Sequence, residues 1–364
     1  MPPKLHVIQP LCLWTRWKRY KLMRLLVLFF ALLLSACGQE PLVQTQSYVF
    51  GTLVDISIYG ESEDKAHAVT SQILQNFQRL HHQYHAWQSD SELSKLNQSF
   101  AAGKTLVTIS PELAQMLKQA QALSKQCQGL FNPAIGGLIG TWGFQRDEFM
   151  PVKIDDVAIQ KLTKASPQMS DIVIKDNTAY SLNPAVKLDL GGYAKGYALD
   201  LALAELHKQG IKNALVNIGG NIIALGKHGD KPWRVGIQHP RQPKPLATVD
   251  LPSGWAIGTS GDYQRYFEQG GKRYCHIIDP RTGYPAQGAQ AVTVLIPPSF
   301  QTGVLSDVAS KPIFLSVPAQ RAQVAKEMGV ENYLVVDAQG DVTLSASMNQ
   351  RVHWLSKPAN VTVQ

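Results

Sequence analysis

The chain has 364 residues, of which 45% are hydrophobic and 17% charged, and its formal net charge is +8. Six of the 35 basic residues lie within positions 1–24, and without them 29 basic residues face 27 acidic ones. The rest of the chain is therefore nearly neutral. This excludes the strong positive field of a nucleic-acid-binding protein, and we expect no nucleic-acid partner. Four cysteines without a C-x-x-C pair exclude a zinc ribbon and a dithiol redox motif.

Residues 1–36 have the pattern of a secretory signal. Basic residues without an acidic one precede an apolar run at 25–34, which is too short to span a bilayer permanently. The ending LSAC (34–37) resembles a bacterial lipoprotein box, in which Cys37 carries the lipid, including palmitate, and becomes the mature N-terminus. A plain cleaved signal peptide and an uncleaved anchor are the alternatives, and Met23 is an alternative start. Residues 37–47 are polar and predict a tether.

The chain behind this leader begins with helices and strands and then becomes rich in strands. A strand pattern covers 48–60. Apolar residues spaced three and four apart predict helices over 63–82, 111–126 and 193–209, the last ending at Gly210. Strand patterns then follow one another at 213–226, 233–238, 247–252, 255–260, 272–279, 291–296 and 332–338. Strands in succession predict an α+β fold with a mostly antiparallel sheet core and flanking helices. We expect one domain over 48–350 and a C-terminal tail over 351–364.

The segment LDLGGYAKGYALD (188–200) places charge and glycines at a helix start. A strand is predicted at 186–190, a turn at Gly191 and Gly192, and a helix directly after them. The unpaired backbone N–H groups of such a helix start form an anion site. Lys195 opposes the helix dipole in the first turn, which indicates a negative group nearby. Alternatively, Asp189 caps the helix and Lys195 is solvated.

Two further clusters combine polar, glycine and aromatic residues. Residues 258–287 include Thr259, Ser260 and His276, and their variety favours a ligand-lined surface over a plain hairpin with a polar tip. Residues 129–144 are rich in glycine and aromatic residues, a composition that a packed loop would also explain.

Together and in this order, these segments resemble the ApbE family of FAD:protein FMN transferases. The matching blocks are FGT (50–52), DSELSKLN (90–97), GLFNPAIGGLIGTWGF (129–144), DLGGYAKGYALD (189–200), LVNIGGN (215–221), TSGDYQRYF (259–267) and HIIDPRTGYP (276–285). The resemblance implies an ApbE-like fold with FAD in a cleft between two packed lobes. It also implies an activity, in which FMN passes from FAD to a Thr or Ser hydroxyl of an acceptor protein, AMP is released, and Mg²⁺ stabilises the developing charge.

The resemblance also assigns site residues one by one. Trp87 matches a position that stacks on the flavin, and Lys195 with the turn N–H groups offsets diphosphate charge. The full set of implied cofactor positions is Phe50, Trp87, Leu130, Phe131, Asn132, Asp189, Lys195 and Ile278. The implied metal positions are Asp307, Ser310 and Lys311, together with the carbonyl of Gly192.

Two of these positions depart from the family pattern. Asn132 stands where the family has Asp, and Lys311 stands where a Thr hydroxyl ligates Mg²⁺. An ammonium has no lone pair to offer a hard cation. There are three alternatives. Lys311 turns outward while Asp307 and Ser310 bind the metal more weakly, or Lys311 occupies the place of the metal. In the third, the alignment is shifted by one residue and Ser310 is the ligand. The functions that correspond are an active transferase or an FAD-binding lipoprotein with little or no transferase activity. An exported solute-binding lipoprotein is a further alternative.

The base that accepts the hydroxyl proton has three candidates. These are His276, with its near-neutral pKa range, Asp307 and Asp279. A strand histidine bonded to the backbone is the alternative for His276. Cys127 and Cys275 either form a disulfide or remain buried thiols.

The resemblance implies a partner and a location as well. The expected acceptor is a periplasm-facing subunit of a membrane redox complex, and the expected location is the periplasmic side of a bacterial membrane, reached through the lipid on Cys37. Gly38 in place of Asp after this cysteine favours the outer membrane.

Overall fold

The centre of the protein is a large, mostly antiparallel sheet. The computed structural model describes residues 40–103, 106–146 and 148–364, and within them a nine-stranded sheet has the order β1-β2-β6-β7-β10-β13-β14-β15-β17. Among its described strand pairs, only β15 and β17 run parallel. The predicted α+β fold is confirmed. The strands are β1 (Leu42–Val49), β2 (Thr52–Tyr59), β6 (Ala214–Ile218), β7 (Asn221–Leu225), β10 (Ala256–Gly261), β13 (Ala289–Ile296), β14 (Asn332–Asp337), β15 (Val342–Leu344) and β17 (Val361–Val363).

Smaller sheets and helices pack around this sheet. The smaller sheets combine β16 (Val352–Trp354), β9 (Pro245–Leu251) and β8 (Trp233–Gln238), then β3 (Val107–Thr108), β5 (Thr178–Ser181) and β4 (Ile172–Lys175), and finally β11 (Tyr266–Gln269) and β12 (Lys272–Cys275). The helices are α2 (Glu63–Gln83), α3 (Glu92–Ala101), α4 (Pro111–Gln126), α5 (Gly136–Thr141), α6 (Asp156–Ala165), α7 (Ala194–Lys208), α8 (Thr302–Val308), α9 (Ser310–Leu315), α10 (Arg321–Glu327) and α11 (Ala346–Asn349).

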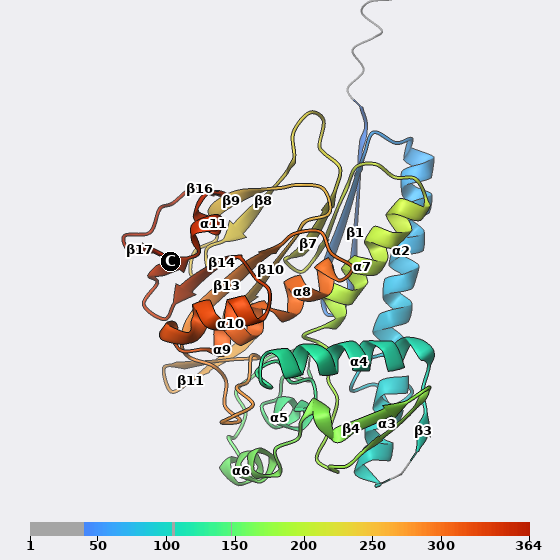
Figure 1. Ribbon diagram of the computed structural model, residues 1–364, viewed down its shortest axis with the longest axis vertical. Coiled ribbons are helices and arrows are strands. Elements are labelled where there is room, and N and C mark those ends of the chain that lie inside the picture. The colour runs from blue at the N-terminus through green and yellow to red at the C-terminus, as the bar shows by residue number, and fades with distance from the viewer. Residues whose placement is uncertain (1–39, 104–105, 147) are drawn as a thin grey trace, which may run out of the picture. The chain divides into compact units, whose positions relative to one another are not determined.

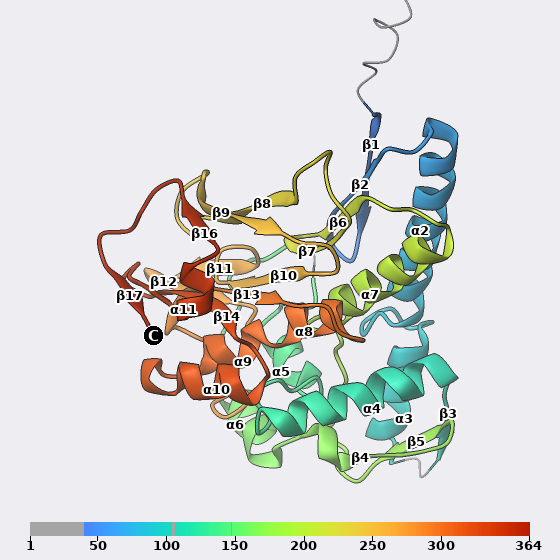
Figure 2. The ribbon, with the colours of Figure 1, turned by 45° about the horizontal axis from the view of Figure 1, so that its top comes forward.

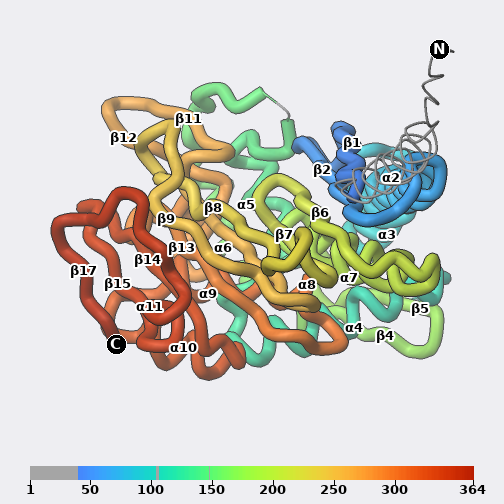
Figure 3. The backbone as a smooth tube through the Cα atoms, turned by 90° about the horizontal axis from the view of Figure 1, so that it is seen from above, coloured from blue at the N-terminus to red at the C-terminus, as the bar shows by residue number. Residues whose placement is uncertain are grey.

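The large sheet lies between two different layers. Helices α7 and α8 cover one face, and β8 and β9 cover the other (Figures 1 and 2); Figure 3 gives the view from the β8–β9 side. Strand β13 is buried along its whole length, with Val292 and Val294 in the helix-side core and Ala291 and Leu295 in the β8–β9 core. Side chains alternate between the faces of a strand, so burial on both faces explains its unbroken apolar sequence.

Helices α3 to α6 lie together with β3 and β4 in the lower part of Figure 1, whereas α2 runs beside β1 and α7. Helix α5 meets the β11–β12 hairpin from much later in the chain, because Trp142 stacks on Phe267 and Tyr274. These rings belong to a separate hydrophobic cluster that also contains Phe144 and Ile278. The cluster brings the 129–144 and 258–287 segments to one place.

The three predicted helices are confirmed with small changes at their ends. Helix α2 begins after Ser62, whose side chain accepts a hydrogen bond from the N–H of Lys65. Helix α4 begins after Ser110 and has Pro111 in its first turn, where a missing N–H costs nothing. Helix α7 has no side-chain hydrogen bond at its N-cap, Tyr193. Its first turn is held in other ways, since the N–H of Ala194 donates to the carbonyl of Leu190 at 2.8 Å and the N–H of Gly196 donates to Asp307 at 3.1 Å.

Two predicted boundaries are wrong. Residues 42–47 are not a tether but part of β1, because polar side chains pair across to β2: Gln44 bonds to Ser57 and Gln46 bonds to Asp55. Residues 351–364 are not a plain tail, since they contain β16 and β17, which pair with β9 and β15.

The predicted strand at 186–190 is also absent, because its hydrogen bonds go to side chains and loops. The Asn97 side chain accepts from the N–H of Leu188 at 2.7 Å and donates to its carbonyl at 2.9 Å. Asp189 N–H donates to the carbonyl of Pro133. This extended segment holds the glycine turn against the 130–133 loop.

The predicted signal over 1–36 and the predicted lipidation of Cys37 lie outside the described residues. Within those residues, we find no helix long and apolar enough to cross a membrane. Cys127 and Cys275 are both buried and unpaired, so the disulfide alternative is wrong.

Candidate functional site

A cavity of about 1010 Å³ lies between the β1–β2 hairpin, the glycine turn before α7, the end of β10 and helices α8 and α9. It is large enough for a dinucleotide. The predicted site residues that line it are Phe50, Trp87, Leu130, Phe131, Asn132, Asp189, Gly192, Lys195, His276, Ile278, Asp307 and Lys311. Ser310 and Asp279 do not line it. Ser310 is buried behind Asp307, and Asp279 forms an ion pair with Arg281 at 2.6 Å.

Phe50 has a backbone conformation that is rare for a bulky residue. Phe50 and Gly51 form the two-residue turn between β1 and β2, with φ angles of 58° and 68°. Such a turn favours glycine, asparagine or aspartate at both positions. The Phe50 ring packs on Phe77 and His81 while lining the cavity. Phenylalanine is unfavourable in the backbone conformation of this turn. Its presence therefore indicates that the ring has a role at the cavity.

Trp87 is fixed by two contacts. Its Nε1 donates to Oδ2 of Asp189 at 2.9 Å, and Nζ of Lys187 lies 3.7 Å from the ring centroid. Burial lowers the pKa of Lys187, and the nearby Asp189 carboxylate acts in the opposite direction. Because Lys187 covers one face of the ring, the other face is the one on which a planar ligand can stack. Asp189 also accepts from the N–H of Gly191, so it does not cap α7 and that alternative is wrong.

The side chain of Asn132 is used within the protein. Its Nδ2 donates to the carbonyl of Pro167 at 2.9 Å, and its Oδ1 accepts from the N–H of Ala134 at 3.0 Å. These bonds fix the loop that presents Leu130 and Phe131 to the cavity. Asn132 thus shapes the site through the backbone.

Asp307 and Lys311 form a nearly buried ion pair at one end of the cavity. Nζ of Lys311 donates to Oδ1 of Asp307 at 2.7 Å and to its backbone carbonyl at 2.6 Å. The side chains are 19% exposed for Lys311 and 3% exposed for Asp307. Burial alone would raise the pKa of Asp307, but the ammonium groups of Lys311 and Lys195 hold it below its usual value. Asp307 is therefore an anion in the folded protein.

The close approach of α7 and α8 places Asp307 at the start of α7. A Cβ on Gly196 would lie 2.4 Å from the carbonyl oxygen of Gly303, so only glycine permits this contact. At this distance the N–H of Gly196 donates to Oδ2 of Asp307 at 3.1 Å. The carboxylate thus partly satisfies the N-terminus of α7 and interacts favourably with its dipole.

Three cationic side chains surround His276 and Asp307. Burial, followed by the positive charges of Arg265, Lys195 and Lys311, lowers the pKa of His276 to about 3. The pKa of Lys195 is also lowered, by burial first and then by Lys311 and Arg265, against the attraction of Asp307. Among the residues that the structure describes, neither Lys195 nor Arg265 has a carboxylate within ion-pair distance. This end of the cavity therefore has a net positive charge and favours an anionic ligand.

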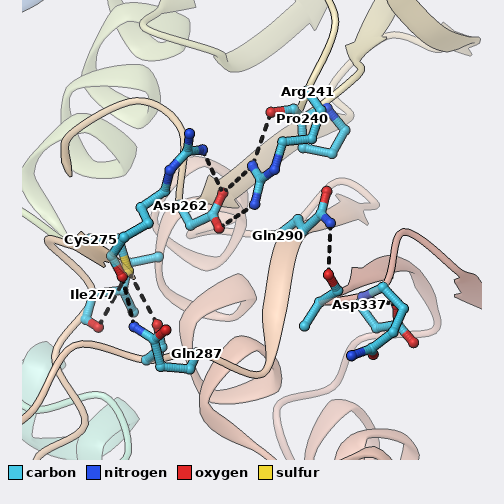
Figure 4. Close-up of polar contacts among 12 residues, drawn as sticks. Pro240, Arg241, Asp262, Cys275, Ile277, Gln287, Gln290 and Asp337 are labelled. Carbon is cyan, nitrogen blue, oxygen red and sulfur yellow. Dashed lines mark hydrogen bonds and ion pairs between the residues drawn. The ribbon is translucent and has the colours of Figure 1, made fainter. Parts of the chain in front are cut away.

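An ion-pair network holds the loop that carries Arg265. Figure 4 shows the carboxylate of Asp262 bound by both terminal nitrogens of Arg241, at 2.6 Å each. Arg273 approaches the same carboxylate at 3.8 Å. Farther along, the backbone carbonyl of Arg265 accepts from the N–H of His276 at 3.0 Å. Arg265 and His276 are thus positioned together.

Residues 50–351 match the sequence model of the ApbE family, which is most of the chain. The chain belongs to the ApbE family. Among its relatives, a protein of Rhodobacter capsulatus named FAD:protein FMN transferase is 39% identical over 325 residues, which are 89% of this chain and 61% of that protein. A protein of Haemophilus influenzae with the same name is 32% identical, over 87% of this chain and 93% of its own length.

Solved ApbE structures share the fold. The ApbE protein of Thermotoga maritima has a TM-score of 0.77 and 29% identity, over 85% of this chain and 99% of its own. The flavin transferase ApbE of Vibrio cholerae has a TM-score of 0.73 and 27% identity, over 86% of this chain and 99% of its own.

The predicted Mg²⁺ ligands of this ApbE protein do not fit a divalent cation. Lys311 does not turn outward, and its ammonium holds both the carboxylate and the carbonyl of Asp307. The Ser310 hydroxyl is buried and bonded to Ser260 at 2.7 Å. At an effective dielectric constant of about 20, a divalent ion about 4 Å from an ammonium is repelled by about 8 kcal/mol, which cancels the attraction of similar size from the single Asp307 carboxylate. Within the described ranges, we also find no group of three His, Cys, Asp or Glu side chains that could hold a metal.

The three candidate bases differ in the ApbE site. Asp279 lies outside the cavity lining, and Asp307 is committed to Lys311 and the α7 N-terminus. His276 lines the cavity, and its Nδ1 lies 3.3 Å from the carbonyl of Arg265. Nδ1 of His276 therefore contacts the backbone, and the second ring nitrogen, Nε2, is left to contact a ligand.

Arg265 is the site residue that the sequence did not single out. It lies within the 258–287 cluster, whose mixed polar composition was the available signal. Arg265 lies near Lys195 and Lys311 only because the fold brings together three segments that are far apart in the sequence.

Proposed function

We propose that this chain transfers FMN from FAD to a Thr or Ser hydroxyl of an acceptor protein and releases AMP. The observation that carries the proposal is that one cavity is lined both by aromatic rings and by three cationic side chains. Trp87 and Phe50 suit an isoalloxazine ring, while Lys195, Arg265 and Lys311 suit the diphosphate. The membership in the ApbE family and the relatives named FAD:protein FMN transferase support the same activity.

The reaction is an in-line displacement at the phosphorus on the FMN side. The acceptor hydroxyl oxygen forms a bond to that phosphorus, the bond from phosphorus to the oxygen of the AMP phosphate breaks, and AMP leaves with the bonding electrons. Charge grows on the phosphoryl oxygens and on AMP, and the three cations at this end of the cavity stabilise it.

His276 is the proposed acceptor of the hydroxyl proton. Its pKa of about 3 belongs to the site without a ligand, where burial and three positive charges oppose protonation. The negative diphosphate of FAD offsets these charges and raises the pKa of His276 into a more useful range for a base. Asp307 instead holds Lys311 and the start of α7 in place.

The test is the intact mass of an acceptor protein. The full-length chain is incubated with FAD and an acceptor that has a single flavin-accepting threonine. We expect a mass gain of one FMN group and an equal amount of AMP, and neither with the threonine replaced by alanine. Lys195→Met should abolish the gain, while Lys208→Met, on the exposed end of α7, should keep it. Absence of a gain at saturating FAD would contradict the transfer.

FAD binding without transfer is the second candidate, favoured by the ion pair between Lys311 and Asp307. It predicts a yellow protein that binds FAD and leaves the acceptor mass unchanged. The same experiment therefore separates the two functions.

The proposed acceptor is a periplasm-facing subunit of a membrane redox complex, which a lipid-anchored enzyme on the same side of the membrane could reach. The support is the export pattern with LSAC at 34–37 and the neutral composition behind it. Labelling of growing cells with an alkyne analogue of palmitate should mark the wild type and Cys12→Ser, but not Cys37→Ser. Equal labelling of all three would contradict the anchor.

A further inference from the structure

Lys311 contacts both segments that border the cationic end of the cavity. Its ammonium holds Asp307 at the α8–α9 junction through two oxygens. Its aliphatic chain lies against the glycine turn, because Cε is 2.8 Å from the position that a Cβ on Gly192 would take. One side chain therefore joins Asp307 to the turn that begins α7.

The charges at this end of the cavity balance a diphosphate without a further ion. Lys195, Arg265 and Lys311 supply three positive charges, and Asp307 supplies one negative charge, while the Asp189 carboxylate at the glycine turn is offset by the nearby Lys187 ammonium. The remaining two positive charges equal the two negative charges of the FAD diphosphate. A divalent cation would add two more positive charges beside an ammonium that is 19% exposed, where solvent screens little.

We propose that the Lys311 ammonium replaces a divalent metal ion beside the FAD diphosphate, so that this chain binds FAD and transfers FMN without a metal. Lys311 takes part as a point charge with three N–H donors, of which two are used by Asp307 and one is left for a phosphate oxygen. The inference rests on the proposed function, since it concerns how the same site neutralises the negative charge of FAD.

The test compares FAD binding by the full-length chain in chelator and in excess Mg²⁺, measured by quenching of flavin fluorescence. For the wild type we expect the two dissociation constants to agree within about twofold, since we find no ligand set for the ion among the residues that the structure describes. Lys311→Thr should bind FAD about tenfold more weakly in chelator and recover in Mg²⁺, because an oxygen ligand replaces a charged donor. The matched control is Lys326→Thr on α10, an exposed position that should behave as the wild type in both conditions.

A second variant guards against misfolding. Lys311→Met keeps the aliphatic chain against Gly192 and should bind FAD weakly with and without Mg²⁺, because it offers neither charge nor oxygen. Wild-type binding that tightens about tenfold in Mg²⁺ would overturn the inference, and so would a Lys311→Thr variant without metal dependence. Loss of all FAD binding by the wild type would instead contradict the proposed function itself.

Discussion

Replacing Gly196 by alanine places a methyl group in the contact between α7 and α8. The new Cβ would lie 2.4 Å from the carbonyl oxygen of Gly303 and 2.7 Å from Cα of Val304, whereas ordinary contacts begin at 3.4 Å. Both nearest atoms belong to the backbone, so no side chain can turn aside. The two helices must therefore separate by about 1 Å in a close-packed interior.

The expected cost follows from this displacement. Overpacking of a core costs about 1–3 kcal/mol, and the better helix propensity of alanine returns about 1 kcal/mol. The separation also lengthens the 3.1 Å hydrogen bond from Gly196 N–H to Asp307. We expect a net loss of about 1–2 kcal/mol of unfolding free energy, which lowers the melting temperature by a few degrees, about 2–4 °C per kcal/mol. FAD affinity should fall as well, because Asp307 moves with α8 and Lys311 is bonded to Asp307.

Thermal unfolding followed by circular dichroism and FAD titration by fluorescence measure both effects. Gly288→Ala is the matched control, since a Cβ there meets only Nη2 of Arg321, at 3.9 Å. An unchanged melting temperature and an unchanged FAD affinity in Gly196→Ala would refute the reasoning from the α7–α8 contact.

Three further changes test other parts of the site. Trp87→Ala should weaken FAD binding about tenfold or more through loss of stacking, measured by fluorescence titration, while Trp87→Phe should retain most of the affinity. His276 is kept neutral in the folded protein, with its pKa lowered from 6.5 to about 3, so the protein should lose stability as the pH falls from about 6.5 toward 3; in urea unfolding, His276→Gln should lose less between about pH 7 and pH 4.5. Burial raises the pKa of Cys275 to about 12, so a thiol reagent should label Cys127 and Cys275 only after unfolding, and a reductant should leave the melting temperature unchanged.

The sequence allowed the helices α2, α4 and α7 and the interior strands to be predicted, because their patterns are local. The spacing in α2 and α4 and the serines before them carry the signal within one segment. The first part of strand β1 was missed because residues 44–47 are polar and the strand is held by its pairing with β2. The strand predicted at 186–190 failed for a similar reason, since its backbone bonds go to Asn97 and to the 130–136 loop.

Most residues that the family resemblance assigned line one cavity, but the electrostatics of that cavity could not be predicted from the sequence. Only folding of the whole sheet brings together the residues that line the cavity, which include Phe50, Trp87, Lys195 and Asp307. The ion pair between Lys311 and Asp307 could be foreseen as one of three alternatives, yet only the structure places the ammonium 2.7 Å from the carboxylate. Arg265 was missed because nothing in its local sequence indicates that it faces Lys195.

The central claim is that one cavity holds FAD with its flavin at Trp87 and its diphosphate among Lys195, Arg265 and Lys311. A crystal structure of the full-length chain with FAD, grown in chelator, tests it most directly. The account predicts the isoalloxazine ring on the Trp87 face opposite Lys187 and diphosphate oxygens within hydrogen-bond distance of all three cations. A diphosphate bound elsewhere, or a flavin away from Trp87, would contradict it.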